Sequence, residues 1–242
     1  MNNPAQHFRP AHASDAIACT PLMFAAGIHE FRFFLGVPDD QILAFLRFAF
    51  ALDRGHFSWR RHYVACAPEG SVLSEMAAHD HRDTLFDDPH LAWTVLRFFG
   101  PLQTPGILGR GLILSSELPA PKRGQTLLTN IATDARVRGM GIFPAMLAHA
   151  LTSGWLHCAP GGQYLLDVVQ DNTRARHVYE RLGFVAQPRR RPPSARLPAA
   201  LISQRMVWSA QGMAALREQG ATMQTEALQD QPASATHPEA NA

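Results

Sequence analysis

The chain has 242 residues, of which 46% are hydrophobic, and its charged residues nearly balance to a formal net charge of +2. This length and composition can bury a sizeable core in one domain. The balance excludes an overall electrostatic attraction to nucleic acid or to an anionic membrane surface. Three widely spaced cysteines, Cys19, Cys66 and Cys158, indicate reduced thiols and no disulfide framework. No apolar run reaches the roughly 18 residues of a membrane span, so we expect a cytoplasmic protein with no membrane partner.

Local patterns in the first half of the chain predict a strand, helices and a hairpin. A short strand and a helix are expected in residues 7–27. Apolar residues at helical spacing predict a second helix in residues 38–55. Residues 60–80 divide at a Pro-Glu-Gly turn into two strands. A helix is expected at 90–99, and the stretch rich in Gly and Pro at 100–120 is expected to be a loop.

The second half alternates between strand and helix patterns. The predicted elements are, in order, a strand at 124–133, a helix at 142–154, a strand at 163–169, a helix at 172–183 and a hairpin of 184–190 with 200–209. This order predicts an α/β fold, in which helices flank a mixed sheet that contains a parallel pair. We expect one folded domain over residues 7–209. Residues 210–242 are polar and are expected to form a disordered tail.

A glycine-rich turn leads from the strand at 124–133 into the next helix. Gly139 and Gly141 permit close approach to the backbone, and the start of a helix offers unpaired N–H groups and partial positive charge. Arg136 and Arg138 add positive charge, so the turn suits a pyrophosphate. An ordinary strand-to-helix turn fits the same letters, because short glycine motifs recur by chance.

The helix predicted at 172–183 places polar and small residues along one stripe. Asn172, Ala175, Arg176 and Tyr179 follow offsets of zero, three, four and seven along it. This face suits a narrow, extended ligand that lies beside the helix. The alternative is purely structural, with Asn172 as a helix cap and Tyr179 as a core aromatic.

Together, the segments "NIATDARVRGMGIF" and "NTRARHVYERLGF" resemble the two signatures of the GNAT superfamily of acetyl-CoA-dependent N-acetyltransferases. Phe143 stands where the family more often has a small residue. The resemblance extends over roughly residues 7 to 209. It implies the mixed sheet of that family, acetyl-CoA as co-substrate and no metal.

The resemblance also implies a cofactor site at the ends of two strands. The pantetheine arm is expected to pair with the strand around Ile131, Ala132 and Thr133, and the pyrophosphate to rest on the following turn. The expected cofactor-binding residues are Ile131, Ala132, Thr133, Arg138, Gly139, Met140, Gly141, Ile142, Phe143, Asn172, Ala175 and Tyr179.

Direct acetyl transfer to an amine requires an acid for the leaving thiolate and a base for the amine. The resemblance places Tyr179 in the role of the acid. Asp167 stands where some relatives carry a glutamate base, and it is equally compatible with a role in organising the end of its strand. Glu117 and Glu75 are rival candidates. His79-Asp80-His81 is interpreted as a solvated strand end, not as a metal site.

The expected function is therefore transfer of an acetyl group from acetyl-CoA to a primary amine on a small molecule or a protein. A non-catalytic acyl-CoA-binding module is the main alternative. The arginine-rich loop at 188–198 is interpreted as solvated, with attraction of an acidic acceptor as the alternative, and no nucleic-acid partner is expected because the loop lacks aromatic residues for stacking. The chain is expected to be a monomer or homodimer.

Overall fold

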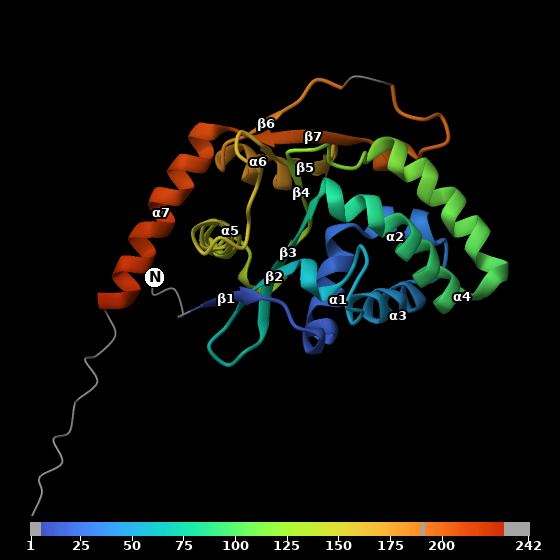
Figure 1. Cartoon of the computed structure of the whole chain (residues 1–242), viewed down its shortest axis with the longest axis horizontal. Helices are drawn as coiled ribbons and strands as arrows, with labels where there is room; N and C mark the ends of the chain where they lie inside the picture. The colour runs from blue at the N-terminus through green and yellow to red at the C-terminus, as the bar shows by residue number, and fades with distance from the viewer. Residues whose placement is uncertain (1–5, 190–191, 230–242) are drawn as a thin grey trace, which may run out of the picture.

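Seven strands form one mixed sheet in the computed structural model, which describes residues 6–189 and 192–229 and, within that part, the side chains outside 83–88 and 223–229 (Figure 1). The strands are β1 (His7–Pro10), β2 (His62–Cys66), β3 (Val72–Asp80), β4 (Gln125–Thr133), β5 (Gln163–Val169), β6 (Phe184–Ala186) and β7 (Ser203–Trp208). They lie in the order β1-β2-β3-β4-β5-β7-β6. Only β4 and β5 run parallel among these paired neighbours, so the predicted α/β class with a mixed sheet and one parallel pair is confirmed.

Helices cover both faces of the sheet. The helices are α1 (Ala16–Ala26), α2 (Ile28–Leu35), α3 (Asp39–Phe50), α4 (His81–Glu117), α5 (Ile142–Thr152), α6 (Thr173–Arg181) and α7 (Ala210–Gln229), with short 3-10 turns η1 (Ala13–Asp15), η2 (Trp59–Arg61), η3 (Ala135–Val137) and η4 (Ala199–Leu201). Helices α1 to α4 share one buried hydrophobic cluster, and α5 to α7 share the other. Among the described residues, no helix has the length and apolar character that a membrane crossing needs.

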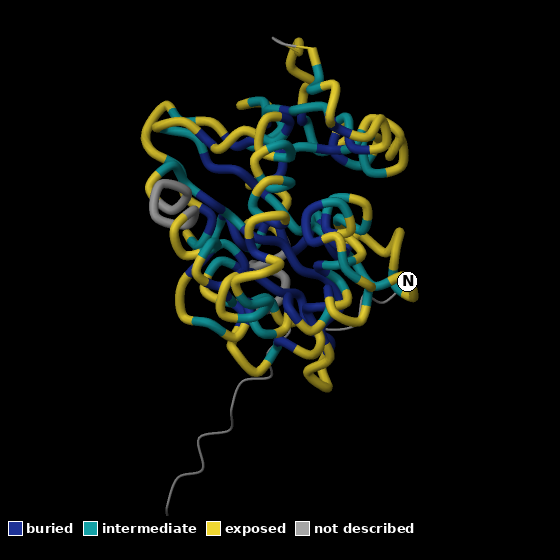
Figure 2. The backbone as a smooth tube through the Cα atoms, turned by 90° about the vertical axis from the view of Figure 1, so that its right-hand side faces the viewer, coloured by how far each residue is buried: buried dark blue, intermediate teal, exposed yellow. Residues whose placement is uncertain are grey.

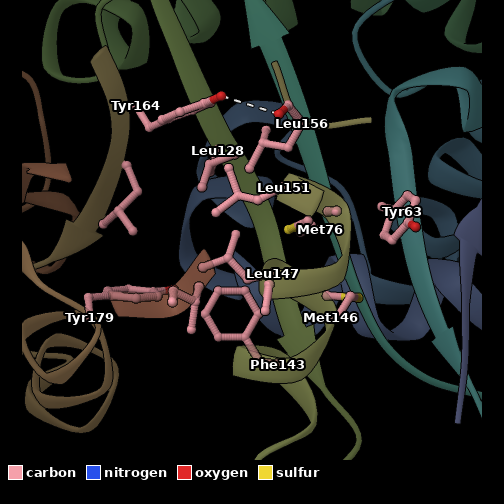
Figure 3. Close-up of a cluster of buried hydrophobic side chains, with 14 of the residues drawn as sticks. Tyr63, Met76, Leu128, Phe143, Met146, Leu147, Leu151, Leu156, Tyr164 and Tyr179 are labelled. Atoms are coloured by element: carbon pink, nitrogen blue, oxygen red, sulfur yellow. Dashed lines mark hydrogen bonds between the residues drawn. The ribbon is translucent and has the colours of Figure 1, made fainter. Parts of the chain in front are cut away.

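The two clusters hold the layers together, and the buried stretches run along the strands (Figure 2). On the α5 side, Met146 and Leu147 pack beside aromatic residues (Figure 3). The rings of Phe184 and Trp208 stack there with centroids 4.9 Å apart. On the α1 side, Phe45 lies fully buried among other aromatic rings. Burying each such side chain contributes about 1.5–3 kcal/mol.

Helix α4 corrects the loop expected at 100–120. The helix bends at Gly100, whose φ of 75° and ψ of 174° are not helical, and then continues to Glu117. Gly111, beyond the bend, permits close packing, because a Cβ there would lie 3.0 Å from the Phe34 ring. Arg110 donates from Nε to the Phe34 carbonyl (3.0 Å) at the end of α2. Contact with α2, a helix that the sequence analysis did not predict, therefore stabilises this part of α4.

Helix α7 occupies residues 210–229, where a disordered tail was expected, and residues 230–242 lie outside the described part. Leu216 is buried in the cluster beside α5, and Met213 packs against that cluster. Gly220 approaches α5 closely, since a Cβ there would lie 3.2 Å from Ala148 Cβ. The short apolar stripe of α7 therefore folds because α5 offers it a surface.

Candidate active site

Strands β4 and β5 pair over only part of their length. The pairs run from Gln125 with Gln163 to Leu128 with Leu166, and both strands continue beyond this point. The rest of β4 pairs only with β3, and the rest of β5 pairs with β7. The two strands thus separate at their carboxyl ends. In the part of the chain that the structure describes, no strand pairs there with the facing edge of β4, which carries Ile131 and Ala132.

Asn130 marks the point at which the strands separate. It is the one described residue other than glycine with a positive φ, 50°, a conformation that Asn tolerates better than most residues. The β3–β4 register shifts beside it, between Glu75 and Ala77. The Nδ2 of Asn130 is buried and makes no hydrogen bond to the described residues. This unpaired donor was missed in the sequence, where the only signal is a lone Asn inside a strand pattern.

The glycine turn follows β4 and begins α5. Gly139 (φ 84°) and Gly141 (φ 78°) adopt left-handed conformations, and nothing lies within 4 Å of a Cβ built at either position. Gly141 is the N-cap residue of α5, whose first N–H groups lack helical partners. The turn is therefore open to an anion. Ile142 and Phe143 are buried, so they offer a ligand their backbone and not their side chains.

The sequence predicts that both arginines of this turn add positive charge to it, but the structure holds the two side chains differently. Arg136 donates to both oxygens of Asp134, and the closest contact is 2.7 Å. The Arg136 hydrogen bonds lower the pKa of Asp134 to about 2. Arg138 donates from Nε to the Thr133 carbonyl (3.0 Å). Its terminal nitrogens make no hydrogen bond to the described residues. Arg138 is thus the better placed of the two to meet a phosphate, since Asp134 offsets the charge of Arg136.

Helix α6 starts beside the end of β5. Asn172 caps it, and its Oδ1 accepts the Ala175 N–H at 3.1 Å. Ala175 is half-buried and Tyr179 is 8% exposed. The Tyr179 ring packs against Phe143, with centroids 6.2 Å apart (Figure 3). It also packs against Phe184. Of the residues in the predicted stripe, Tyr179 therefore faces the first turn of α5, where Phe143 lies.

Burial raises the pKa of Tyr179 well above its usual range. Its hydroxyl makes no hydrogen bond to the described residues, in contrast to that of Tyr164, which donates to the Leu156 carbonyl at 3.2 Å. Tyr179 is therefore protonated at neutral pH, and its O–H group is not engaged in a hydrogen bond to any described residue.

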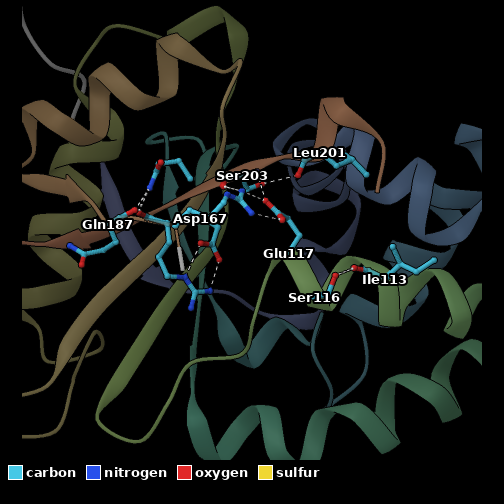
Figure 4. Close-up of polar contacts among 10 residues, drawn as sticks. Ile113, Ser116, Glu117, Asp167, Gln187, Leu201 and Ser203 are labelled. Carbon is cyan, nitrogen blue, oxygen red and sulfur yellow. Dashed lines mark hydrogen bonds and ion pairs between the residues drawn. The ribbon is translucent and has the colours of Figure 1, made fainter. Parts of the chain in front are cut away.

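Asp167 and Glu117 both lie beside β7, as Figure 4 shows. Asp167 accepts from Arg205 through both oxygens, at 2.9 and 2.6 Å. Burial raises the pKa of Asp167, and the hydrogen bonds from Arg205 act in the opposite direction. This geometry organises the β5–β7 pair. A role as base stays a prediction, since any proton transfer to Asp167 must compete with Arg205.

Glu117 ends α4 and joins it to the β6–β7 connection. Its oxygens accept from both terminal nitrogens of Arg189, one of them at 2.9 Å, and from the Ser203 N–H at 2.7 Å. Burial raises the pKa of Glu117, but the Arg189 and Ser203 hydrogen bonds outweigh burial and hold it below the usual range. Arg189 was expected in a solvated loop and is instead ion-paired. Arg190 and Arg191 of that loop lie outside the described residues.

Glu75, the remaining carboxylate candidate, is fully buried in β3 beneath α1. Its Oε2 lies 3.4 Å from Nδ1 of His62, which is also fully buried and was missed in the sequence. Burial raises the pKa of Glu75. The neighbouring Ser74 of β3 donates to the Ala132 carbonyl at 2.8 Å. This hydrogen bond stabilises the part of β4 that does not pair with β5.

His79 corrects the interpretation of residues 79–81 as a solvated strand end. Its side chain is buried, stacks on His56 with ring centroids 4.3 Å apart, and has Nε2 3.1 Å from Thr129 Oγ1. Among the described residues, no group of three His, Cys, Asp or Glu is arranged to hold a metal ion.

Comparison with solved structures gives the same fold. An N-acetyltransferase from Staphylococcus aureus Mu50 matches 83% of this chain and 99% of its own, with 18% identity and a TM-score of 0.58. A structure described as histone acetyltransferase HPA2 and related acetyltransferase, from Corynebacterium glutamicum ATCC 13032, matches 84% of this chain and 95% of its own, with 20% identity and a TM-score of 0.52. A comparison with curated proteins gave no match.

The sequence also matches the family model described as Acetyltransferase (GNAT) family over residues 9–184. This range is more than half of the chain, and it includes the open edge of β4, the glycine turn and the capped start of α6. The protein therefore belongs to the GNAT acetyltransferase family.

Proposed function

We propose that the protein transfers an acetyl group from acetyl-CoA to a primary amine. The observation that carries this proposal is the separation of β4 from β5 at the end where the glycine turn and Asn172 lie. An extended arm can pair with the unpartnered edge of β4, and a phosphate group fits the open turn at Gly139 and Gly141. Bound there, acetyl-CoA supplies the acetyl group as an activated thioester.

In this proposal the cofactor contacts divide between backbone and side chains. Backbone groups of Ile131, Ala132 and Thr133 pair with the pantetheine arm, and those of residues 139–143, including Met140, bind the pyrophosphate together with the Arg138 side chain. The Oδ1 of Asn172 already caps α6, so its amide N–H groups are the part available to the cofactor. The small side chain of Ala175 leaves room for the cofactor beside α6.

Tyr179 is proposed as the acid that protonates the departing thiolate. Its raised pKa keeps the proton on the hydroxyl until the carbon–sulfur bond breaks, because a thioester sulfur is a very weak base and becomes basic only as it departs as a thiolate. Asp167 is proposed to accept the proton that the amine loses, through an intervening water; each of its oxygens keeps a further lone pair while it binds Arg205. Glu117 suits this role less well, since its pKa is lowered.

A turnover assay tests the proposed function. The full chain is mixed with acetyl-CoA and a broad panel of small amines and peptides, and free thiol is measured over time. Amine-dependent thiol release with an acetylated product supports the proposal. If calorimetry detects acetyl-CoA binding but no amine gives thiol release, the protein is a non-catalytic acyl-CoA-binding module, and the proposed reaction is wrong.

Asn172 allows the cap and the cofactor contact to be separated. Asn172→Ala should lose both functions, with about 1 kcal/mol of stability from the cap and weaker acetyl-CoA binding. Asn172→Asp retains an oxygen acceptor for the Ala175 N–H but has no amide donor, so it should unfold like the wild type and still bind acetyl-CoA more weakly. Thermal unfolding and calorimetry measure the two effects. Normal binding by both variants would leave Asn172 with a structural role alone.

A further inference from the structure

A cavity of about 510 Å³ lies away from the proposed active site. Its lining comes from the α3–β2 connection, the first half of α4 and the α5–β5 connection, with Ala78 of β3 between them. Ala78 pairs with Leu128, and Thr126 Oγ1 donates to the His157 carbonyl at 3.2 Å, so the cavity lies at the start of β4. The glycine turn follows the other end of that strand. Seven residue steps of strand separate the two by roughly 23 Å.

The described lining is strongly basic. Arg54, Arg60, Arg61, His90 and His157 face a single acidic residue, Asp53. A smaller cavity of about 240 Å³ shares Asp53, Arg54 and His90 and adds Arg97. The whole chain carries a formal net charge of only +2, so this accumulation of arginines is local.

Two of the arginines are held in place by their surroundings. The Arg60 guanidinium lies 4.5 Å from the centroid of the Trp59 ring, and its contact with the exposed Asp53 is a long 3.4 Å. Arg61 donates from Nε to the Gly55 carbonyl at 3.0 Å. Such fixed guanidinium groups bind oxyanions at a smaller entropic cost than free ones.

Arg54 adds donors that the described structure does not use, and His157 is held in a fixed orientation. Arg54 makes no hydrogen bond or ion pair with any described residue, although it lines both cavities. The Nδ1–H of His157 donates to the Trp155 carbonyl at 3.1 Å and so orients the imidazole ring. The Trp155 ring is itself fixed against Tyr63, with centroids 4.7 Å apart.

We call the larger cavity, with Arg54, Arg60 and Arg61 in its lining, the basic groove. We infer that this groove is a second binding site, which takes a small organic anion with two or more phosphate or carboxylate groups. Planar guanidinium groups bind either oxyanion in the same bidentate manner. The cavity volume is within the range of sites for small molecules, about 300–1,000 Å³. The site is separate from the acetyl-transfer site, so it does not depend on the proposed function.

Calorimetric titration of the full chain with inorganic pyrophosphate and, separately, with citrate tests this inference. We expect at least one of the two to bind, and the stronger ligand identifies whether phosphate or carboxylate groups are preferred. Arg54→Gln should weaken that binding by at least about 10-fold, the scale of a lost charge-assisted hydrogen bond. Arg47→Gln changes an exposed arginine on α3 outside the groove and should bind as the wild type does.

Gly141→Asp distinguishes this site from the glycine turn, where pyrophosphate could also bind. Binding that survives Gly141→Asp and is weakened by Arg54→Gln supports the groove. Arg54 is exposed, so its replacement should not affect folding, and thermal unfolding checks this. The inference is wrong if neither anion binds at millimolar concentration, or if Gly141→Asp abolishes binding and Arg54→Gln does not weaken it.

Discussion

Replacing Tyr179 with Phe is expected to lower the rate of acetyl transfer by about 10²-fold or more, the usual scale of general acid catalysis. The substitution removes one oxygen and preserves the ring that packs against Phe143 and Phe184. Since the hydroxyl makes no hydrogen bond to the described residues, its loss leaves no partner unsatisfied. Stability and acetyl-CoA affinity should therefore change little, and the effect should be confined to an interaction made in the transition state.

Tyr164→Phe is the matched control, because it also removes a tyrosine hydroxyl from the same hydrophobic cluster. That hydroxyl donates to the Leu156 carbonyl, so its loss should cost about 1 kcal/mol of stability and leave the transfer rate intact. The rates are measured by single-turnover mixing, because slow product release would hide a change in the chemical step. A Tyr179→Phe variant that transfers acetyl at the wild-type rate would exclude Tyr179 as the acid.

Gly141→Asp should weaken acetyl-CoA binding by about 10- to 100-fold, which corresponds to the loss of one or two charge-assisted hydrogen bonds. A Cβ at Gly141 would meet no atom within 4 Å, so the protein has space for the side chain. The added carboxylate would lie at the N-terminus of α5, where it would occupy the position proposed for the pyrophosphate and repel it.

Gly141→Asn separates charge from backbone strain. Both variants must adopt the φ of 78°, and both side chains have nearly the same size. The Asn variant should therefore show the same strain and a clearly smaller loss of acetyl-CoA affinity by calorimetry. Equal affinities of the Asp, Asn and wild-type proteins, all shown to be folded, would contradict the phosphate assignment.

Elements with strong local signals were predictable from the sequence. Asn172 and Gly183 delimit α6, and the glycine turn precedes α5 as expected. The parallel pair of β4 and β5 follows from the alternation of strand and helix. The cap and the turn are determined by residues adjacent in the chain, and the parallel pair by the order of consecutive elements, so a pattern in the sequence is sufficient for both.

Elements that depend on distant contacts were not predictable. The glycines of α4 resemble those of a loop, and only the position of Phe34 shows that Gly111 permits helix packing. The apolar residues of α7 are too few to predict a helix without the surface of α5. The same limit applies to the candidate site, since the partners of Asp167 and Glu117, Arg205 and Arg189, come from a hairpin remote in sequence.

The order of the strands has a consequence for synthesis of the protein on the ribosome. Strand β7 lies between β5 and β6 in the sheet, although β6 precedes it in the chain. Until residue 208 has been made, the apolar strand β5 has an open edge on that side, and β6 has no strand to pair with. An open apolar edge is a template for pairing with other chains. If synthesis pauses in the β6–β7 connection, the nascent chain exposes this edge and can misassemble with other chains. Chaperone binding would be most useful at that stage.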